Sequence, residues 1–255
     1  YLHGGADADQ FNLKSATFSA GNGTVIAGGG ADTLILSGSS NLSVLKAGEG
    51  ADSIRAIGVN GATVSSLAMG ANADNLTFSG SVTTLRMGNG HDLVSGSTVS
   101  VNTGGGIYLG DGRDTIVATL GGASAISLIG DSSAAAADVI TLTGVTVKSS
   151  IKGAGGSDTI TIGDSMGVSA LIAGNAGSDS IVLSGIVSTG TTIGGGSGAD
   201  TITFAGTSFS GDAFHVKGGA DADSINFAGN VLSGANSTGI QIQGGTGADS
   251  ITFSD

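Results

Sequence analysis

One phrase of ten residues, Gly244–Phe253, reads GGTGADSITF: a glycine-rich turn, one aspartate, and then polar residues alternating with Ile251 and Phe253. Nearly the same phrase, GGSGADTITF, stands at 195–204. Alternation of polar and apolar residues with a period of two predicts a strand with one buried face. A phrase that recurs in this way is typical of repeat architectures.

Twelve copies of the phrase account for the whole chain, and one aspartate marks each copy. Successive aspartates are 18 to 26 residues apart, and the eleven intervals total 240 residues, which gives a mean near 22. Four further acids (Asp7, Glu49, Asp111 and Asp221) lie in the same turns, so 12 + 4 = 16 of the 20 acidic residues gather there. The twelve marking aspartates are Asp9, Asp32, Asp52, Asp74, Asp92, Asp114, Asp138, Asp158, Asp179, Asp200, Asp223 and Asp249.

Composition excludes several classes of protein. The chain has 255 residues, of which 49 are glycine and none is proline or cysteine. Disorder is not expected because 39% of the residues are hydrophobic. Without cysteine there is no disulfide framework, so any internal staple must be of another kind, such as a metal. The formal net charge of −12 argues against nucleic acid as a partner. No apolar run reaches the roughly 18 residues that a transmembrane helix needs.

Large apolar residues form two columns in the repeat. They stand two positions after all twelve aspartates, and seven positions before eleven of them. Each copy is therefore predicted to be a strand, a glycine turn, a second strand and a looser turn. One coil cannot bury its apolar face alone, whereas stacked coils can. The sequence predicts an all-β fold, a single parallel β-solenoid (β-roll or β-helix) of about twelve coils over residues 1–255, with the glycine-aspartate turns on one edge. The irregular point is 131–137, and we expect the chain to be a segment of a longer repeat array.

Glycines occupy fixed positions in the turn. The residue two before the aspartate is Gly, Asn or Asp in eleven copies, and these residue types tolerate a left-handed backbone. The residue four before is Gly in nine copies. We expect such a turn to direct backbone carbonyl oxygens toward a pocket with a carboxylate at its edge. The glycines that we expect to shape this pocket are Gly5, Gly28, Gly30, Gly48, Gly50, Gly88, Gly90, Gly110, Gly112, Gly196, Gly198, Gly219, Gly245 and Gly247.

Stacking would align the carboxylates about 4.8 Å apart, where two charges repel by about 1 kcal/mol even in water. Calcium would relieve this repulsion, because it takes roughly 6–8 oxygen ligands from carboxylates and carbonyls, whereas magnesium keeps its waters. The alternative is that each aspartate caps the amides of its own turn. The turn at 134–138 has no glycine, so of the eleven gaps between turns about nine should hold an ion. The expected ligands are Asp9, Asp32, Asp52, Asp74, Asp92, Asp114, Asp158, Asp179, Asp200, Asp223 and Asp249.

The phrases GGSGAD (195–200) and GGTGAD (244–249), each followed by a polar residue and Ile, resemble the GGxGxDxU motif of secreted RTX calcium-binding proteins. The resemblance covers the whole chain through the twelve copies, and it is strongest to bacterial S-layer and haemolysin-like surface proteins. It implies a calcium-loaded β-roll that leaves a bacterium by type I secretion and folds outside the cell. Rolls of that family have the motif on both edges, whereas this chain has it on one, so we expect ions along one edge.

No set of catalytic residues stands out. The histidines His3, His91 and His215 occur singly, and no serine stands in a nucleophile motif with a matching His and Asp. The arginines occupy different positions of the repeat. An ice-binding face would need ranks of Thr and Asn in register, and the residue after each aspartate is too varied over the whole chain for that.

The leading hypothesis is a calcium-stabilised structural segment of an extracellular bacterial surface protein, S-layer-like or filament- or sheath-like, and not an enzyme. The alternatives are a calcium-folding secretion or targeting module of a secreted enzyme (protease, lipase or epimerase type), and the stalk of an adhesin or fibre. The expected partners are calcium, neighbouring repeats of the same parent protein and other copies of the chain. Cell-surface polysaccharide is a further candidate partner.

Overall fold

The computed structural model describes residues 1–14, 23–37, 41–57, 63–121, 125–131, 136–145, 148–164, 166–210, 213–228 and 239–254. The chain divides into two compact units, which are described separately: unit 1 is Tyr1–Gly122 and unit 2 is Ala123–Asp255. All the elements in the described ranges are strands. Within those ranges no helix is long and apolar enough to cross a membrane. The expected all-β class is confirmed.

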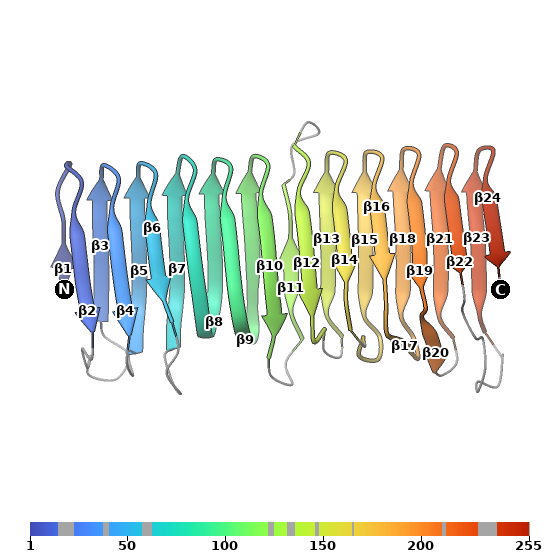
Figure 1. Cartoon of the computed structure of the whole chain (residues 1–255), viewed down its shortest axis with the longest axis horizontal. Helices are drawn as coiled ribbons and strands as arrows, with labels where there is room; N and C mark the ends of the chain where they lie inside the picture. The colour runs from blue at the N-terminus through green and yellow to red at the C-terminus, as the bar shows by residue number, and fades with distance from the viewer. Residues whose placement is uncertain are drawn as a thin grey trace. The chain divides into compact units, whose positions relative to one another are not determined.

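Unit 1 is a stack of parallel strands (Figure 1). Strands that precede the aspartate turns pair with one another in the order β1, β3, β5 and β7, and strands that follow the turns pair in the order β2, β4 and β6. The strands of unit 1 are β1 (Leu2–His3), β2 (Gln10–Lys14), β3 (Gly23–Gly29), β4 (Thr33–Ser37), β5 (Asn41–Glu49), β6 (Ser53–Ala56), β7 (Thr63–Ala71), β8 (Asn75–Asn89), β9 (Leu93–Asp111) and β10 (Thr115–Leu120).

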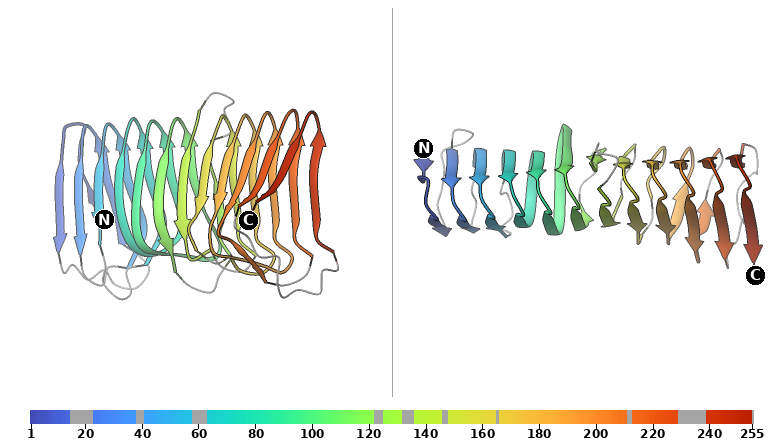
Figure 2. Two further views of the ribbon diagram at one scale, coloured as in Figure 1. Left: turned by 45° about the vertical axis from the view of Figure 1, so that its right-hand side comes forward. Right: turned by 90° about the horizontal axis from the view of Figure 1, so that it is seen from above.

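Unit 2 is built in the same way. On one face each strand pairs with the next in the series β11, β13, β15, β18, β21 and β23. On the other face the series is β12, β14, β16, β19, β22 and β24 (Figure 2). The strands of unit 2 are β11 (Ser127–Ile129), β12 (Val139–Thr143), β13 (Ser150–Gly155), β14 (Thr159–Ile162), β15 (Leu171–Ala176), β16 (Ser180–Leu183), β17 (Ile186–Ser188), β18 (Thr192–Ser197), β19 (Thr201–Ala205), β20 (Ser208–Ser210), β21 (His215–Ala220), β22 (Ser224–Ala228), β23 (Gln241–Thr246) and β24 (Ser250–Ser254).

The two apolar columns of the sequence form ladders inside each unit. In unit 2, Ile160, Ile181, Ile202 and Ile225 are partners in successive parallel strands, and each is at most 1% exposed. The column seven positions before the aspartate is equally regular. In the seventh copy Leu128 takes that place and pairs with Ile151, so the longer turn is an insertion between strand and aspartate. The predicted parallel β-solenoid is therefore confirmed, because period-two alternation and coil stacking together leave only one way to bury these side chains.

The number of turns comes out slightly lower than the twelve copies when separate strands are counted. β8 contains both the strand after Asp74 and the strand before Asp92, and β9 likewise runs through two copies. Their register shifts beside Phe78 and beside Val82 show where the looser turn has shrunk to an irregularity within one strand. A large side chain lies between small ones along the ladder there: Phe78 is flanked by Ala56 and Gly96, two of the three small residues of its column.

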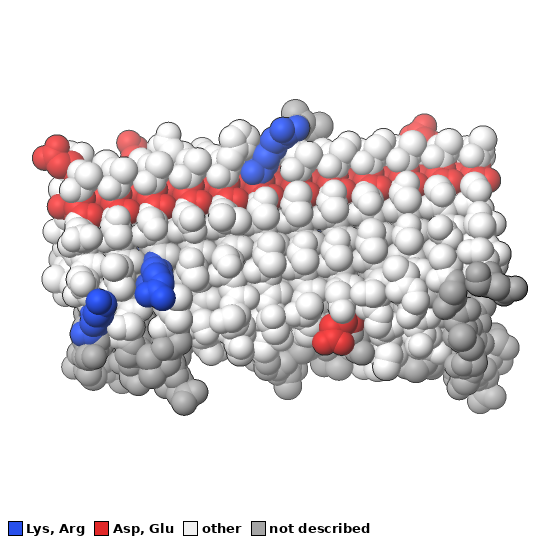
Figure 3. Space-filling model, in the orientation of Figure 1, with Lys and Arg blue, Asp and Glu red and all other residues white. Residues whose placement is uncertain are grey.

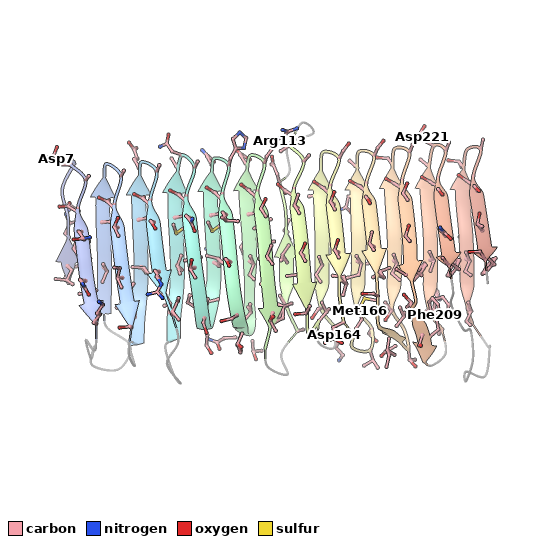
Figure 4. The ribbon with its side chains drawn as sticks, in the orientation of Figure 1. Asp7, Arg113, Asp164, Met166, Phe209 and Asp221 are labelled. Atoms are coloured by element: carbon pink, nitrogen blue, oxygen red, sulfur yellow. The ribbon has the colours of Figure 1, made fainter. Side chains whose placement is uncertain are left out.

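In unit 2 apolar side chains also fill the edge opposite the aspartate turns. β17 pairs with β20, and Val145, Met166, Val187 and Phe209 are buried along this edge. Backbone hydrogen bonds join the coils, as from the N–H of Met166 to the carbonyl of Ile186 at 2.8 Å. Figure 4 shows Met166 and Phe209 on this edge and Asp221 on the aspartate edge. The opposite edge of unit 2 thus presents packed apolar side chains where the aspartate edge presents carboxylates.

Candidate metal centre

The turn backbone adopts the left-handed conformation that the sequence predicts, and it does so at two positions in each regular turn. Two residues before the aspartate, φ is positive in ten copies, and the non-glycine residues among them are Asn72 and Asp221. Four residues before, φ is positive in ten copies as well, and there the sequence had indicated only a glycine preference. At this second position a Cβ would also lie within 3 Å of the carbonyl of the preceding coil, as at Gly48 against Gly28. Glycine is therefore favoured there for conformation and for space.

The first turn is an exception, since neither Gly5 nor Asp7 has a positive φ. There the N–H of Gly5 donates to Oδ2 of Asp9 at 2.7 Å, so this aspartate caps its own turn. Copies eight and nine are the opposite case. They have Ala154 (φ 84°) and Asn175 (φ 82°) four residues before the aspartate, and both adopt the left-handed conformation without being glycine.

Ala154→Gly is expected to stabilise the chain by about 1 kcal/mol. The left-handed conformation costs an alanine roughly 1–2 kcal/mol, and the greater freedom of glycine in the unfolded chain offsets about 0.4–1 kcal/mol of that gain. Denaturant unfolding at constant calcium measures the effect. Ala173→Gly is the matched control, because Ala173 lies in the neighbouring strand β15 without a positive φ and should lose stability instead. Equal destabilisation by both changes would contradict the argument.

The aspartates form a hydrogen-bonded ladder in each unit. The backbone N–H of each donates to Oδ1 of the aspartate in the next copy, at 2.7–2.8 Å from Asp9 to Asp114 in unit 1 and at 2.8–3.0 Å from Asp138 to Asp249 in unit 2. The capping alternative is therefore partly right, but the capped amide belongs to the neighbouring coil. Figure 3 shows the ladder as a line of acidic atoms beside the turns of each unit.

The second carboxylate oxygen is buried and lacks a hydrogen-bond partner in most copies. The aspartates concerned are only 1–3% exposed. Their Oδ2 atoms without a partner are those of Asp32, Asp52, Asp74, Asp92, Asp158, Asp179, Asp200 and Asp223. A buried, ionised oxygen without a donor is costly, so each of these sites calls for a proton or a cation.

Burial changes the acidity of the ladder accordingly. Desolvation raises the pKa of Asp74, Asp158 and Asp200 to about 7 and that of Asp179 to about 6, and the backbone hydrogen bond to each carboxylate offsets only part of that rise. The pKa values of Asp52, Asp92 and Asp223 are raised for the same reason. At neutral pH the carboxyl groups of Asp74, Asp158 and Asp200 are therefore divided between their charged and neutral forms.

The turn before Asp138 differs from the others, as the sequence indicated. Ala134 lies outside the described residues, and Ala136 has no positive φ. Oδ2 of Asp138 accepts a hydrogen bond from the N–H of Asp131 at 2.9 Å, and Asp131 itself is fully buried. A protein donor thus reaches this carboxylate oxygen, which gives it less need of a cation than its neighbours have.

The chemistry of the donor set fits a hard cation. Among the described residues no three His, Cys, Asp or Glu side chains converge, so an ion would depend on backbone oxygens for most of its ligands. Carbonyls do approach the carboxylates: in unit 2 Oδ2 of Asp179 and the carbonyl of Gly195 both lie within 3 Å of the point where a Cβ on Gly174 would stand. Carboxylate and carbonyl oxygens are the ligands that calcium prefers, and the chain has no cysteine thiolate for zinc.

The remaining candidates do not form a second site. Arg55 lies in β6, Arg86 in the second half of β8, and Arg113 in the turn before Asp114, so the arginines do not share one face. The guanidinium of Arg86 lies 5.1 Å from the ring centroid of Tyr108, and the backbone N–H of Arg113 donates to Nδ1 of His91 at 2.9 Å. The guanidinium of Arg86 and the ring of His91 thus each have a local partner.

Fold and site together define a parallel β-solenoid with a buried carboxylate ladder along one edge of each unit. No protein-family model matches the chain, and no curated protein matches it. Among solved structures it is similar to the crystal structure of a hyperactive, Ca2+-dependent, β-helical antifreeze protein from an Antarctic bacterium. The TM-score is 0.50 and the identity is 18% over 96% of this chain and 80% of the other. At this identity the likeness concerns the fold alone.

Proposed function

We propose that the chain is a calcium-stabilised structural segment of an extracellular bacterial surface protein and that it has no catalytic role. The observation that supports this most is the row of buried Oδ2 atoms without hydrogen-bond partners, in turns whose carbonyls approach them. A cation that binds only the stacked coils would hold them together by mass action. The calcium dependence of the similar β-helical protein agrees with this proposal.

The surface role rests on the resemblance to RTX repeats of S-layer-like and haemolysin-like proteins. A secretion module of an enzyme or the stalk of an adhesin could be built from the same solenoid. Self-association and polysaccharide binding are further proposed properties of its surface. The domains of the parent protein distinguish these roles, since a catalytic domain in the same polypeptide would favour the secretion module.

Calcium-dependent folding is the experiment that tests the proposal. Far-UV circular dichroism of the full chain is expected to show strong β signal with calcium and loss of much of that signal after chelation. An unchanged spectrum and unchanged melting curve without calcium would contradict the proposal.

A second candidate function, binding to an ice surface, is favoured by one face of unit 2. The residue that follows each aspartate varies over the whole chain, but in five successive strands of unit 2 it always carries a hydroxyl group. These residues, all in register, are Thr159, Ser180, Thr201, Ser224 and Ser250. A second rank two residues further on contains Thr161, Thr203 and Thr252. Hydroxyls repeated about every 4.8 Å on a sheet can order water in a lattice, and the similar structure is that of an antifreeze protein.

Thr201→Lys is expected to abolish thermal hysteresis if this face binds ice. Thr201 lies at the centre of the rank, and a long charged side chain there would keep a flat lattice off the sheet. Ser53→Lys is the matched control, because Ser53 is exposed at the same repeat position in unit 1, between Thr33 and Asn75. Absence of hysteresis in the calcium-loaded wild-type chain would rule out this second function and leave the structural one standing.

A further inference from the structure

The two units differ at the residue five positions before the aspartate. In unit 1, from the second turn to the sixth, this residue is apolar and 0% exposed: Ala27, Ala47, Met69, Met87 and Leu109. In unit 2 it is glycine in every turn after the insertion: Gly153, Gly174, Gly195, Gly218 and Gly244. The turn of Asp9 also has a glycine there, Gly4. The residue on the inner side of the turn thus carries a side chain in the second to sixth turns of unit 1 and none in these turns of unit 2.

In unit 2 the aspartate carboxylate fills the space beside this glycine. A Cβ added to Gly195 would come within 3 Å of Cβ, Cγ and Oδ2 of Asp200, and the same holds for Gly153 against Asp158 and for Gly244 against Asp249. No real Cβ approaches other atoms so closely, so an alanine there would have to displace the carboxylate. In the second to sixth turns of unit 1 the residue at this position carries an apolar side chain that is fully buried.

In two of these turns a carbonyl oxygen of the next coil also lies near the point where the Cβ would stand. A Cβ built on Gly174 would lie within 3 Å of both Oδ2 of Asp179 and the carbonyl oxygen of Gly195. A Cβ built on Gly218 would likewise lie within 3 Å of Oδ2 of Asp223 and the carbonyl oxygen of Gly244. Both atoms of each pair are acceptors, and both Oδ2 atoms are buried without a hydrogen-bond partner. Two acceptors that face each other out of water need a positive charge or a proton between them.

We infer that divalent cations bind along the aspartate edge of unit 2, in the four gaps between Asp158 and Asp249, and that the turns from Asp32 to Asp114 in unit 1 bind none. The inference rests on the proposed calcium dependence and narrows it to one part of the chain. Apolar side chains at the inner position of unit 1 exclude an ion there, so the buried Oδ2 atoms of its ladder are left to take up a proton. Calcium would then control the folding of unit 2 while unit 1 folds without it.

Hydrogen exchange of the full chain, read by mass spectrometry with calcium and with chelator, tests the inference. Peptides from β13–β24 are expected to exchange at least about tenfold more slowly with calcium, whereas peptides from β3–β10 are expected to be unchanged. Equal protection of both units by calcium would overturn the inference and leave the proposed function intact. Absence of calcium binding anywhere would overturn both.

Gly195→Ala supplies a second measurement, made by equilibrium dialysis against calcium. The wild-type chain is expected to bind about four ions, and the variant about one fewer, because its methyl group displaces the carboxylate of Asp200. Gly194→Ala is the matched control: a Cβ there would meet only the carbonyl of Lys217, at 3.9 Å, and the ion count should not change. An unchanged count in Gly195→Ala, or an equal loss in Gly194→Ala, would contradict the placement of the sites.

Discussion

Calcium is expected to raise the unfolding temperature of unit 2 by about 20 °C or more relative to the calcium-free chain. Each site that binds only the folded state adds about 2.7 kcal/mol when free calcium is a hundredfold above the dissociation constant. Four sites of this kind add about 10 kcal/mol, and about 1 kcal/mol shifts the midpoint of a domain of this size by several degrees. Scanning calorimetry of the full chain, with calcium and after its removal, measures the shift.

Magnesium is the control ion for this experiment. It demands a tighter octahedral shell and releases its waters reluctantly, so it should give a much smaller shift at the same concentration. Equal stabilisation by both ions would point to screening of a chain with net charge −12 rather than to defined sites. A shift smaller than about 5 °C with saturating calcium would contradict the proposal that calcium holds the coils together.

Much of the fold could be predicted from the sequence, because the spacing within the repeat determines how its strands stack. Alternation after each aspartate determines which side chains face inward, and the spacing of the copies determines which of them meet, as in the stacked rings of Phe204, Phe227 and Phe253 with centroids 4.5 and 4.8 Å apart. What the repeat did not predict is the loss of a turn within β8 and β9. Strand continuity there depends on a few residues between copies, where a short irregularity and a turn look alike in sequence.

The alignment of the aspartates could be predicted from the sequence, but their hydrogen bonds could not. The aspartate column was evident, yet the sequence could not show that Oδ1 is used by the amide of the next coil, because that contact arises only when coils stack in register. The strain at Ala154 was visible only as a gap in a glycine column. The glycine column of unit 2, from Gly153 to Gly244, was also readable. Its meaning became clear only once the carboxylate was found packed against it.

The calcium-free chain is expected to be more stable near pH 4.5 than near pH 8, the reverse of the usual behaviour of aspartates. Their ordinary pKa is 3.8, and burial raises it to about 7 for Asp74, Asp158 and Asp200. Between these values the folded state binds more protons than the unfolded state, so stability falls as pH rises through this window and levels off above about pH 7. Melting curves at several pH values, recorded on chain freed of calcium by dialysis, measure the trend.

Calcium should remove this pH dependence from unit 2 and leave it in unit 1. Above pH 7 an ion replaces the proton on the carboxylates of unit 2, so the stabilisation by calcium should be greater at pH 8 than at pH 4.5, where protons compete for the same oxygens. Asp200→Asn should weaken the pH dependence of the calcium-free chain, since the amide does not ionise. Asp164→Asn, at an exposed position on the opposite edge of unit 2, is the control that should leave the dependence in place (Figure 4). Stability of the calcium-free chain that increases from pH 4.5 to pH 8 would show that the ladder is ionised and satisfied without either a proton or a cation.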